Sequence, residues 1–150
     1  MRDQPQIYGQ LQVTAIDRNG SRFIYDTPNV ITYGAATAAS HVLMGETAYS
    51  IAYMAFGTGN TAPVRGNTAL DAEVYRTSVG TPTYPLVAGL EIGQVLFDVL
   101  LDFGVANGNA LTEAGLFASN GTLLLARQVH SAITKSSNYQ LEYRWQLIFT

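Results

Sequence analysis

The two histidines are the first residues to consider for acid–base chemistry, because they titrate near neutral pH. A titratable side chain needs a positioned partner before it can move a proton. His41 falls in an alanine-rich segment with helical spacing, where a contact on the polar face or at a cap is the simpler interpretation. His130 precedes Ser131, but neighbours on a strand point to opposite faces, so they form no nucleophile–base couple. We therefore expect no catalytic residues and no enzymatic activity.

Paired carboxylates are the next possibility. Asp98 and Asp102 share one face of a predicted strand, with Leu100 between them. Alternate residues of a strand are about 6.6–7 Å apart, so the two carboxylates are expected at about twice that distance. This is too far for one metal ion or for a retaining glycosidase pair. With no cysteine and two distant histidines, three convergent metal ligands are not expected either. The aspartates are interpreted as the solvent-facing or interface edge of a sheet.

The glycines of Gly57-Thr58-Gly59 invite comparison with phosphate-binding loops. A P-loop needs a following Gly-Lys-Ser/Thr, and a dinucleotide fingerprint needs a third glycine that opens a helix. Here the chain continues with Asn60-Thr61-Ala62-Pro63, which is typical of a turn. We therefore expect no cofactor.

Composition narrows the class of partner. Hydrophobic residues make up 47% of the 150 residues, which excludes disorder, whereas charged residues make up only 13%. The net charge of −3 and the scattered basic residues argue against nucleic-acid binding. Apolar runs are too short, and too interrupted by charge, to span a membrane, and no secretory signal opens the chain. These features suggest a single domain, residues 1–150, that buries low-charge surface against protein partners in a cytoplasm.

The elements that position these residues are mostly strands. Alternation predicts a strand over residues 7–16, and Asn19-Gly20 suits the tight turn of a hairpin with residues 22–25. One helix is predicted over residues 32–44, with Thr32 as its N-cap and Gly45 as its stop.

Further strands are predicted along the rest of the chain, at residues 50–56, 73–79, within 87–103, 110–118, 122–130 and 139–149. Residues 61–69 are expected to form a loop, with a helical turn around residues 68–72. In the last strand Leu141, Tyr143, Trp145, Leu147 and Phe149 share one face. About eight strands and one helix indicate a mainly β fold, an antiparallel β-sandwich with an added helix.

Two sequence blocks are similar to attachment modules of tailed bacteriophages, found at the amino-terminal ends of tail-collar and tail-fibre proteins and in baseplate proteins. The first block is FGTGNTAP followed by NTALDAEVYR, with its matching positions at Thr68, Leu70, Glu73, Val74 and Arg76. The second is LTEAGLF followed by SNGTLLLAR, with its matching positions at Thr112, Glu113, Gly115, Leu116, Phe117, Asn120 and Gly121.

The resemblance implies a virion structural protein of the tail, a component that attaches or organises tail fibres through protein contacts and is assembled in the host cytoplasm. Because no repetitive shaft follows, it implies an attachment or baseplate-type module rather than a receptor-binding fibre. A place in the collar or neck stays open. The expected partners are other copies of the chain, in a trimer or ring, and other tail, baseplate or fibre proteins.

Loops 57–67 and 105–109 are expected to contact partners, because small polar groups can be covered without burying charge. Edge strands can accept a neighbour's strand, and the first hairpin and the last strand are the candidates. The candidate protein-interaction residues are Gly57, Thr58, Gly59, Asn60, Glu73, Arg76, Asn107, Glu113 and Asn120.

Two other functions stay open at this point. A carbohydrate-binding β-sandwich of a host-recognition apparatus would gather exposed aromatic side chains around one groove, and the relevant residues are Tyr33, Tyr49, Tyr53 and Tyr84. A small hydrolase would need a nucleophile, a base and an orienting group, which the available residues do not supply in sequence.

Overall fold

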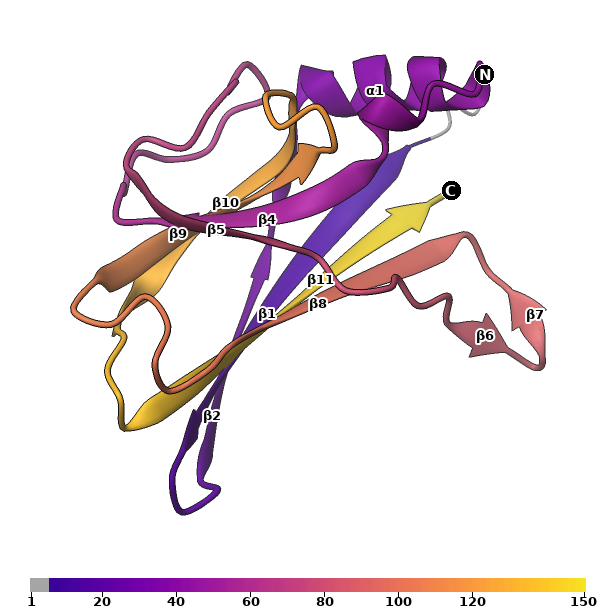
Figure 1. Ribbon diagram of the computed structural model, residues 1–150. Helices are drawn as coiled ribbons and strands as arrows, with labels where there is room; N and C mark the ends of the chain where they lie inside the picture. The colour runs from indigo at the N-terminus through magenta and orange to yellow at the C-terminus, as the bar shows by residue number, and fades with distance from the viewer. Residues whose placement is uncertain (1–5) are drawn as a thin grey trace.

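The computed structural model describes residues 6–150, and their strands form two antiparallel sheets packed face to face (Figure 1). The four-stranded sheet has the order β2 (Arg22–Pro28), β1 (Ile7–Asp17), β11 (Tyr139–Phe149) and β8 (Gln94–Leu101). The five-stranded sheet has the order β3 (Val30–Ile31), β10 (Leu124–Thr134), β9 (Ala110–Ala118), β4 (Ile51–Gly57) and β5 (Glu73–Ser78). The predicted antiparallel β-sandwich with one helix is confirmed.

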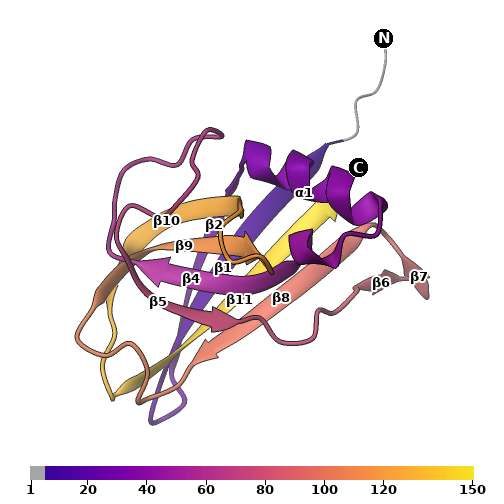
Figure 2. The same ribbon diagram turned by 45° about the horizontal axis from the view of Figure 1, so that its top comes forward.

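The helix, α1, spans Tyr33–Leu43, and Thr32 is its N-cap as predicted. Its backbone ends where predicted, because Gly45 adopts a positive φ of 86° that most residues avoid. Figure 2 shows α1 lying along one end of the sandwich. It packs there through Ala35 and Ala38, whose small side chains let the helix approach Ala118 and Leu125. No helix in the described part of the chain has the length and apolarity to cross a membrane.

Several short elements were not predicted from the sequence. These are β3, the 3-10 helix η1 (Thr47–Tyr49), and a two-stranded hairpin of β6 (Leu86–Val87) and β7 (Leu90–Glu91). The hairpin projects from the sandwich in Figure 1. The strand predicted within 87–103 therefore begins only at Gln94, because positive φ angles at Ala88 and Gly89 turn the chain first. An element of two residues has no measurable periodicity, so only pairing reveals it.

The core lies between the two sheets. Leu141, Tyr143 and Trp145 of β11 are fully buried, as the alternation of that strand predicted, and they pack against Met54 and Phe56 of the opposite sheet. Phe149 continues the alternation but is 47% exposed.

The last strand lies inside its sheet. Strand β11 pairs with β1 along one side and with β8 along the other. The expectation that it could accept a neighbour's strand is therefore wrong, because both of its hydrogen-bonding edges are already used. Strand β2 of the first hairpin, in contrast, pairs with β1 alone and is an edge.

Candidate functional site

The outer face of the five-stranded sheet carries a row of four residues with small side chains in the middle and large ones at its ends. The strand register aligns Arg127, Gly115, Ala55 and Arg76 across β10, β9, β4 and β5. Two small residues thus lie between two arginines. Leu70, from the loop that joins β4 to β5, fills this space: a Cβ added to Gly115 would lie 2.9 Å from the Leu70 Cδ2 atom. The row is therefore shaped to receive the loop.

Glu113 and Arg127 form an ion pair beneath this loop. Both side chains are fully buried. The Nε and Nη2 atoms of Arg127 lie 3.0 and 2.8 Å from Oε2 of Glu113. They come from adjacent strands, β9 and β10, whose antiparallel pairing brings them to one face. A buried charge pair is stable only if its remaining hydrogen-bonding groups are also satisfied.

The carboxylate of Glu113 is satisfied by the backbone of the loop. Its Oε1 accepts the N–H groups of Gly59 and Ala72 at 3.0 and 2.8 Å. Its Oε2 accepts the N–H of Asp71 at 3.1 Å. The helical turn predicted around residues 68–72 is not formed, because these donors bond the carboxylate instead of helical carbonyls. One side chain thus holds both ends of the loop.

The guanidinium of Arg127 binds the same loop from below. It donates to Oδ2 of Asp71 at 2.8 Å, to the carbonyl of Thr61 at 3.0 Å and to Oδ1 of Asn67 at 3.3 Å. A hydrogen bond from Thr61 and the nearby charge of Arg127 lower the pKa of Asp71 below its ordinary value of 3.8. We call Glu113, Arg127 and Asp71 the loop anchor.

The glycines of Gly57-Thr58-Gly59 make room for the loop anchor. A Cβ added to Gly57 would lie 2.4 Å from Oε1 of Glu113 and 2.6 Å from the carbonyl oxygen of Ala72. One added to Gly59 would lie 2.4 Å from Cβ of Asp71. Since real Cβ atoms do not approach so closely, these glycines are required for the close approach of backbone to carboxylate.

Three of the predicted interaction residues, Gly57, Gly59 and Glu113, thus meet inside the chain. The buried carboxylate of Glu113 faces its own loop, which is a different setting from the exposed one expected. Thr58 and Asn60 remain exposed on the outer side of that loop, and the N–H of Thr58 donates to the Ala72 carbonyl at 3.0 Å.

Glu73 and Arg76 form a second, half-exposed pair on β5. The guanidinium donates to both carboxylate oxygens, at 2.8 and 2.7 Å. Arg76 also lies over the ring of Phe117, 3.9 Å from its centroid, and donates to the carbonyl of Gly121. It therefore joins β5 to the turn between β9 and β10.

Asn120 and Asn107 lie in separate turns. The Oδ1 of Asn120 accepts the N–H groups of Thr122 and Leu123 at 3.0 and 3.1 Å, so it shapes its own turn. Asn107 donates to the carbonyl of Phe103 and accepts from Nζ of Lys135 at 3.0 Å. Burial lowers the pKa of Lys135. Asn107 thus belongs to a different cluster from the loop anchor.

Arg127 and Asp71 were not predicted as site residues from the sequence. The only sequence signal for Arg127 is its position at the end of the apolar run Leu123–Leu124–Leu125–Ala126, where a single charge calls for a partner. Asp71 was assigned to a helical turn. Its contact with Arg127 spans 56 positions, which no local pattern can reveal.

The histidines and the paired aspartates serve local contacts. His130 lies 2.8 Å from the carbonyl of Ser131 through Nδ1 and 3.1 Å from the hydroxyl of Tyr143 through Nε2. Burial lowers the pKa of His130 and raises that of Tyr143. His41 stacks on the ring of Tyr49 at 3.9 Å.

The two aspartates face solvent, in agreement with their interpretation. Asp98 accepts from Nε of Arg144 at 2.9 Å, and Asp102 accepts from Nε2 of Gln140 at 2.8 Å. Within residues 6–150 no three histidine, aspartate or glutamate side chains converge as metal ligands would.

The tyrosines considered for carbohydrate binding lie in different surroundings. Tyr33 is 63% exposed beside Arg65, whereas Tyr49 stacks on His41 and Tyr53 packs against the cluster around Leu70. A groove beside the start of α1 is lined by Tyr33 but by none of the other three.

The loop anchor is therefore the most elaborate polar site in the described chain, and its geometry holds a loop rather than a small ligand. Comparisons with protein-family models, with curated proteins and with solved structures found no match for this chain.

Proposed function

We propose that this chain is a structural component of a tailed-phage tail, which attaches or organises tail fibres through protein contacts and catalyses no reaction. The observation that carries the proposal is the folding of the two phage-like sequence blocks onto each other around Glu113. The first block supplies Gly59 and Ala72 as donors to that carboxylate, and the second supplies Glu113 itself and Arg127.

Further contacts run between the two blocks. Leu70 packs against Gly115, Arg76 lies over Phe117, and the hydroxyl of Thr112 donates to the carbonyl of Gly59 at 2.6 Å. The residues that carry the resemblance are thus those that make one structural unit. A unit of this kind fits a module defined by its shape rather than by reactive groups.

The loop held by the anchor supplies a suitable contact surface. Its exposed residues include the uncharged Thr58, Asn60, Thr61, Ala62 and Val64, with one exposed charge beside them at Arg65. Covering such groups costs less than covering ions. Because six hydrogen bonds to the side chains of Glu113 and Arg127 hold the loop from beneath, little ordering entropy is lost when a partner binds. We propose this surface as the one that meets another tail protein.

The first test asks whether the chain is present in purified virions and whether it lies at the tail. Virions of the phage that carries this reading frame should contain the chain in fixed stoichiometry, measured by mass spectrometry of purified particles. Immunogold labelling should place it at the tail. Detection only in the lysate, with none in the washed particles, would contradict a structural role.

The contact surface is tested by a charge placed on the loop. Val64→Asp should reduce co-purification of the chain with tails, because a carboxylate would be buried at the interface. Leu43→Asp, at an 87% exposed position on α1, is the matched control and should leave assembly unchanged. If both variants assemble normally, the loop is not the contact. Binding of the purified chain to a glycan array would favour the carbohydrate-binding alternative.

A further inference from the structure

Strand β2 exposes apolar side chains on both of its faces. Phe23, Ile24 and Tyr25 are 57%, 59% and 39% exposed. The strand register places Phe23 and Tyr25 opposite Ala15 and Val13, on the core side of the sheet, and Ile24 opposite Thr14 on the outer side. Three consecutive exposed apolar residues on an unpaired edge form a surface that proteins normally cover.

The backbone of β2 leaves a regular set of hydrogen-bonding groups free. Two hydrogen bonds show which residues of β2 bond to β1. The N–H of Asp17 donates to the carbonyl of Ser21, and the N–H of Asn29 donates to the carbonyl of Gly9. By the alternation of an antiparallel ladder, the odd-numbered residues of β2 bond to β1. The N–H and C=O groups of Arg22, Ile24 and Asp26 therefore point to the open edge.

The sequence of this edge is complementary to itself. If two copies of β2 pair in antiparallel fashion with Ile24 opposite Ile24, then Arg22 of each copy lies opposite Asp26 of the other. Phe23 of each copy lies opposite Tyr25 of the other. The same register places the free backbone groups of residues 22, 24 and 26 opposite one another, as a hydrogen-bonded ladder requires.

We propose that two copies of this chain pair through β2 about a twofold axis at Ile24. The two four-stranded sheets then form one continuous sheet of eight strands, and the apolar edge is covered. Opposite charges and aromatic pairs that lie directly across a ladder both stabilise it. A register shifted by one residue would bring bonded backbone groups to the interface, and one shifted by two would separate Arg22 from Asp26. Backbone and charges together therefore select this arrangement.

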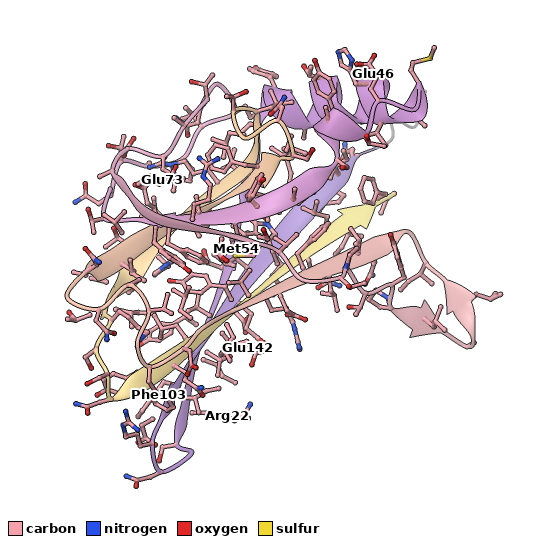
Figure 3. The ribbon with its side chains drawn as sticks, in the orientation of Figure 1. Arg22, Glu46, Met54, Glu73, Phe103 and Glu142 are labelled. Carbon is pink, nitrogen blue, oxygen red and sulfur yellow. The ribbon has the colours of Figure 1, made fainter. Side chains whose placement is uncertain are left out.

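The charged residues of β2 are available for such a contact. Within residues 6–150, neither Arg22 nor Asp26 takes part in an ion pair, and Asp26 accepts only a hydrogen bond from Nε2 of Gln12 at 3.1 Å. The β1–β2 hairpin projects from the sandwich in Figure 1, and Figure 3 shows Arg22 at its end, well away from the core residue Met54. The projection gives a second copy access to the edge.

A twofold contact of this kind closes at two copies. It therefore differs from the trimer or ring expected from the resemblance, which would need a second surface. The pairing also stands independently of the proposed tail function, because its test uses the purified chain alone.

The first experiment measures the mass of the purified chain by light scattering across a concentration series. A dimer of twice 16.2 kDa is expected. Ile24→Lys should raise the dimer dissociation constant by at least about tenfold, because two lysines would face each other at the axis. Leu90→Lys, on the exposed β7, is the control and should leave the mass unchanged. A monomer, a trimer, or equal behaviour of both variants would overturn the proposal.

The second experiment tests the register. Arg22→Asp and Asp26→Arg each place like charges opposite each other, so each variant should be monomeric on its own. When mixed, the two variants carry complementary edges and should form a heterodimer, with one copy supplying two aspartates and the other two arginines. The double variant in one chain should regain the homodimer. Failure of the mixture to associate, with both variants folded by circular dichroism, would exclude pairing centred on Ile24.

Discussion

The two outer faces of the sandwich use the same kind of ion pair in opposite environments. On the five-stranded sheet, Arg127 and Glu113 are fully buried under the loop of residues 58–72. On the four-stranded sheet, Nε of Arg144 lies 2.9 Å from Oδ1 of Asp98, but the two side chains remain 47% and 41% exposed. The atoms and distances are alike, and only the covering differs.

The difference decides what each pair contributes. Exposed pairs are screened by water and contribute about 0–1 kcal/mol. A buried pair gains little net stability, yet removal of one partner leaves an uncompensated charge in a medium of low polarity. The buried pair is therefore a device for holding a loop in one position, while the exposed pair is a solvated feature of a surface.

The largest expected effect follows from breaking the buried pair. Arg127→Met should lower the free energy of unfolding by about 3–5 kcal/mol, because Glu113 would then be buried without a counter-charge. The loop also loses the hydrogen bonds that the guanidinium donates to Asp71, Thr61 and Asn67. Urea denaturation followed by tryptophan fluorescence measures the change through Trp145.

The double variant Glu113→Gln with Arg127→Met is the control for this prediction. It removes both charges while keeping similar volumes, so it should cost clearly less than the sum of the single variants. Equal and additive losses would mean that the pair is not coupled, and the comparison between the two faces would fail.

A smaller effect is expected from filling the space reserved for the carboxylate. Gly57→Ala should cost roughly 1–3 kcal/mol, since its Cβ would meet Glu113 and the backbone of Ala72. Gly66 lies in the loop that follows β4, and a Cβ added there has nothing within 4 Å. Gly66→Ala should therefore change the free energy of unfolding by at most about 0.5 kcal/mol. Similar losses of stability in both variants would mean that the cost of Gly57→Ala does not come from its contact with Glu113.

The buried His130, which lies between the two sheets, should make the stability of the chain depend on pH. Burial lowers the pKa of His130 in the folded chain below its ordinary value of 6.5. As the pH falls below 6.5, the unfolded chain therefore binds more protons than the folded chain, and stability should decrease. His130→Gln should flatten this part of the curve, because a neutral side chain replaces the titrating one. The measurement is urea denaturation between pH 7.5 and 5, and an unchanged slope in the variant would contradict the assignment to His130.

The smallest effect is expected on the open face. Arg144→Met should change the free energy of unfolding by no more than about 1 kcal/mol, and the change should shrink as salt is added. Hydrogen bonding to Asp98 raises the pKa of Arg144, so the guanidinium stays charged. A loss as large as that of Arg127→Met would mean that this face is covered in solution, for example by another chain.

Several strands could be predicted closely from the sequence. Strands β9 and β11 have the predicted bounds, because Asn-Gly turns flank β9 on both sides, and β11 combines regular alternation with a Ser-Asn turn before it. The site was predicted only in part. Gly57, Gly59 and Glu113 were selected from a resemblance, but their burial was not foreseen, since a glutamate on a strand is more often exposed.

The sequence by itself determined the elements: the β-sandwich class, the first hairpin, the helix and the alternation that buries Tyr143 and Trp145. These follow from local period and turn chemistry, which act within a few residues. Only the tertiary structure decided that β11 lies inside its sheet, that β2 is an open edge, and that Glu113 and Arg127 meet under a distant loop. Sheet order and the burial of charge depend on contacts between segments far apart in the chain, and no local pattern specifies which of them will meet.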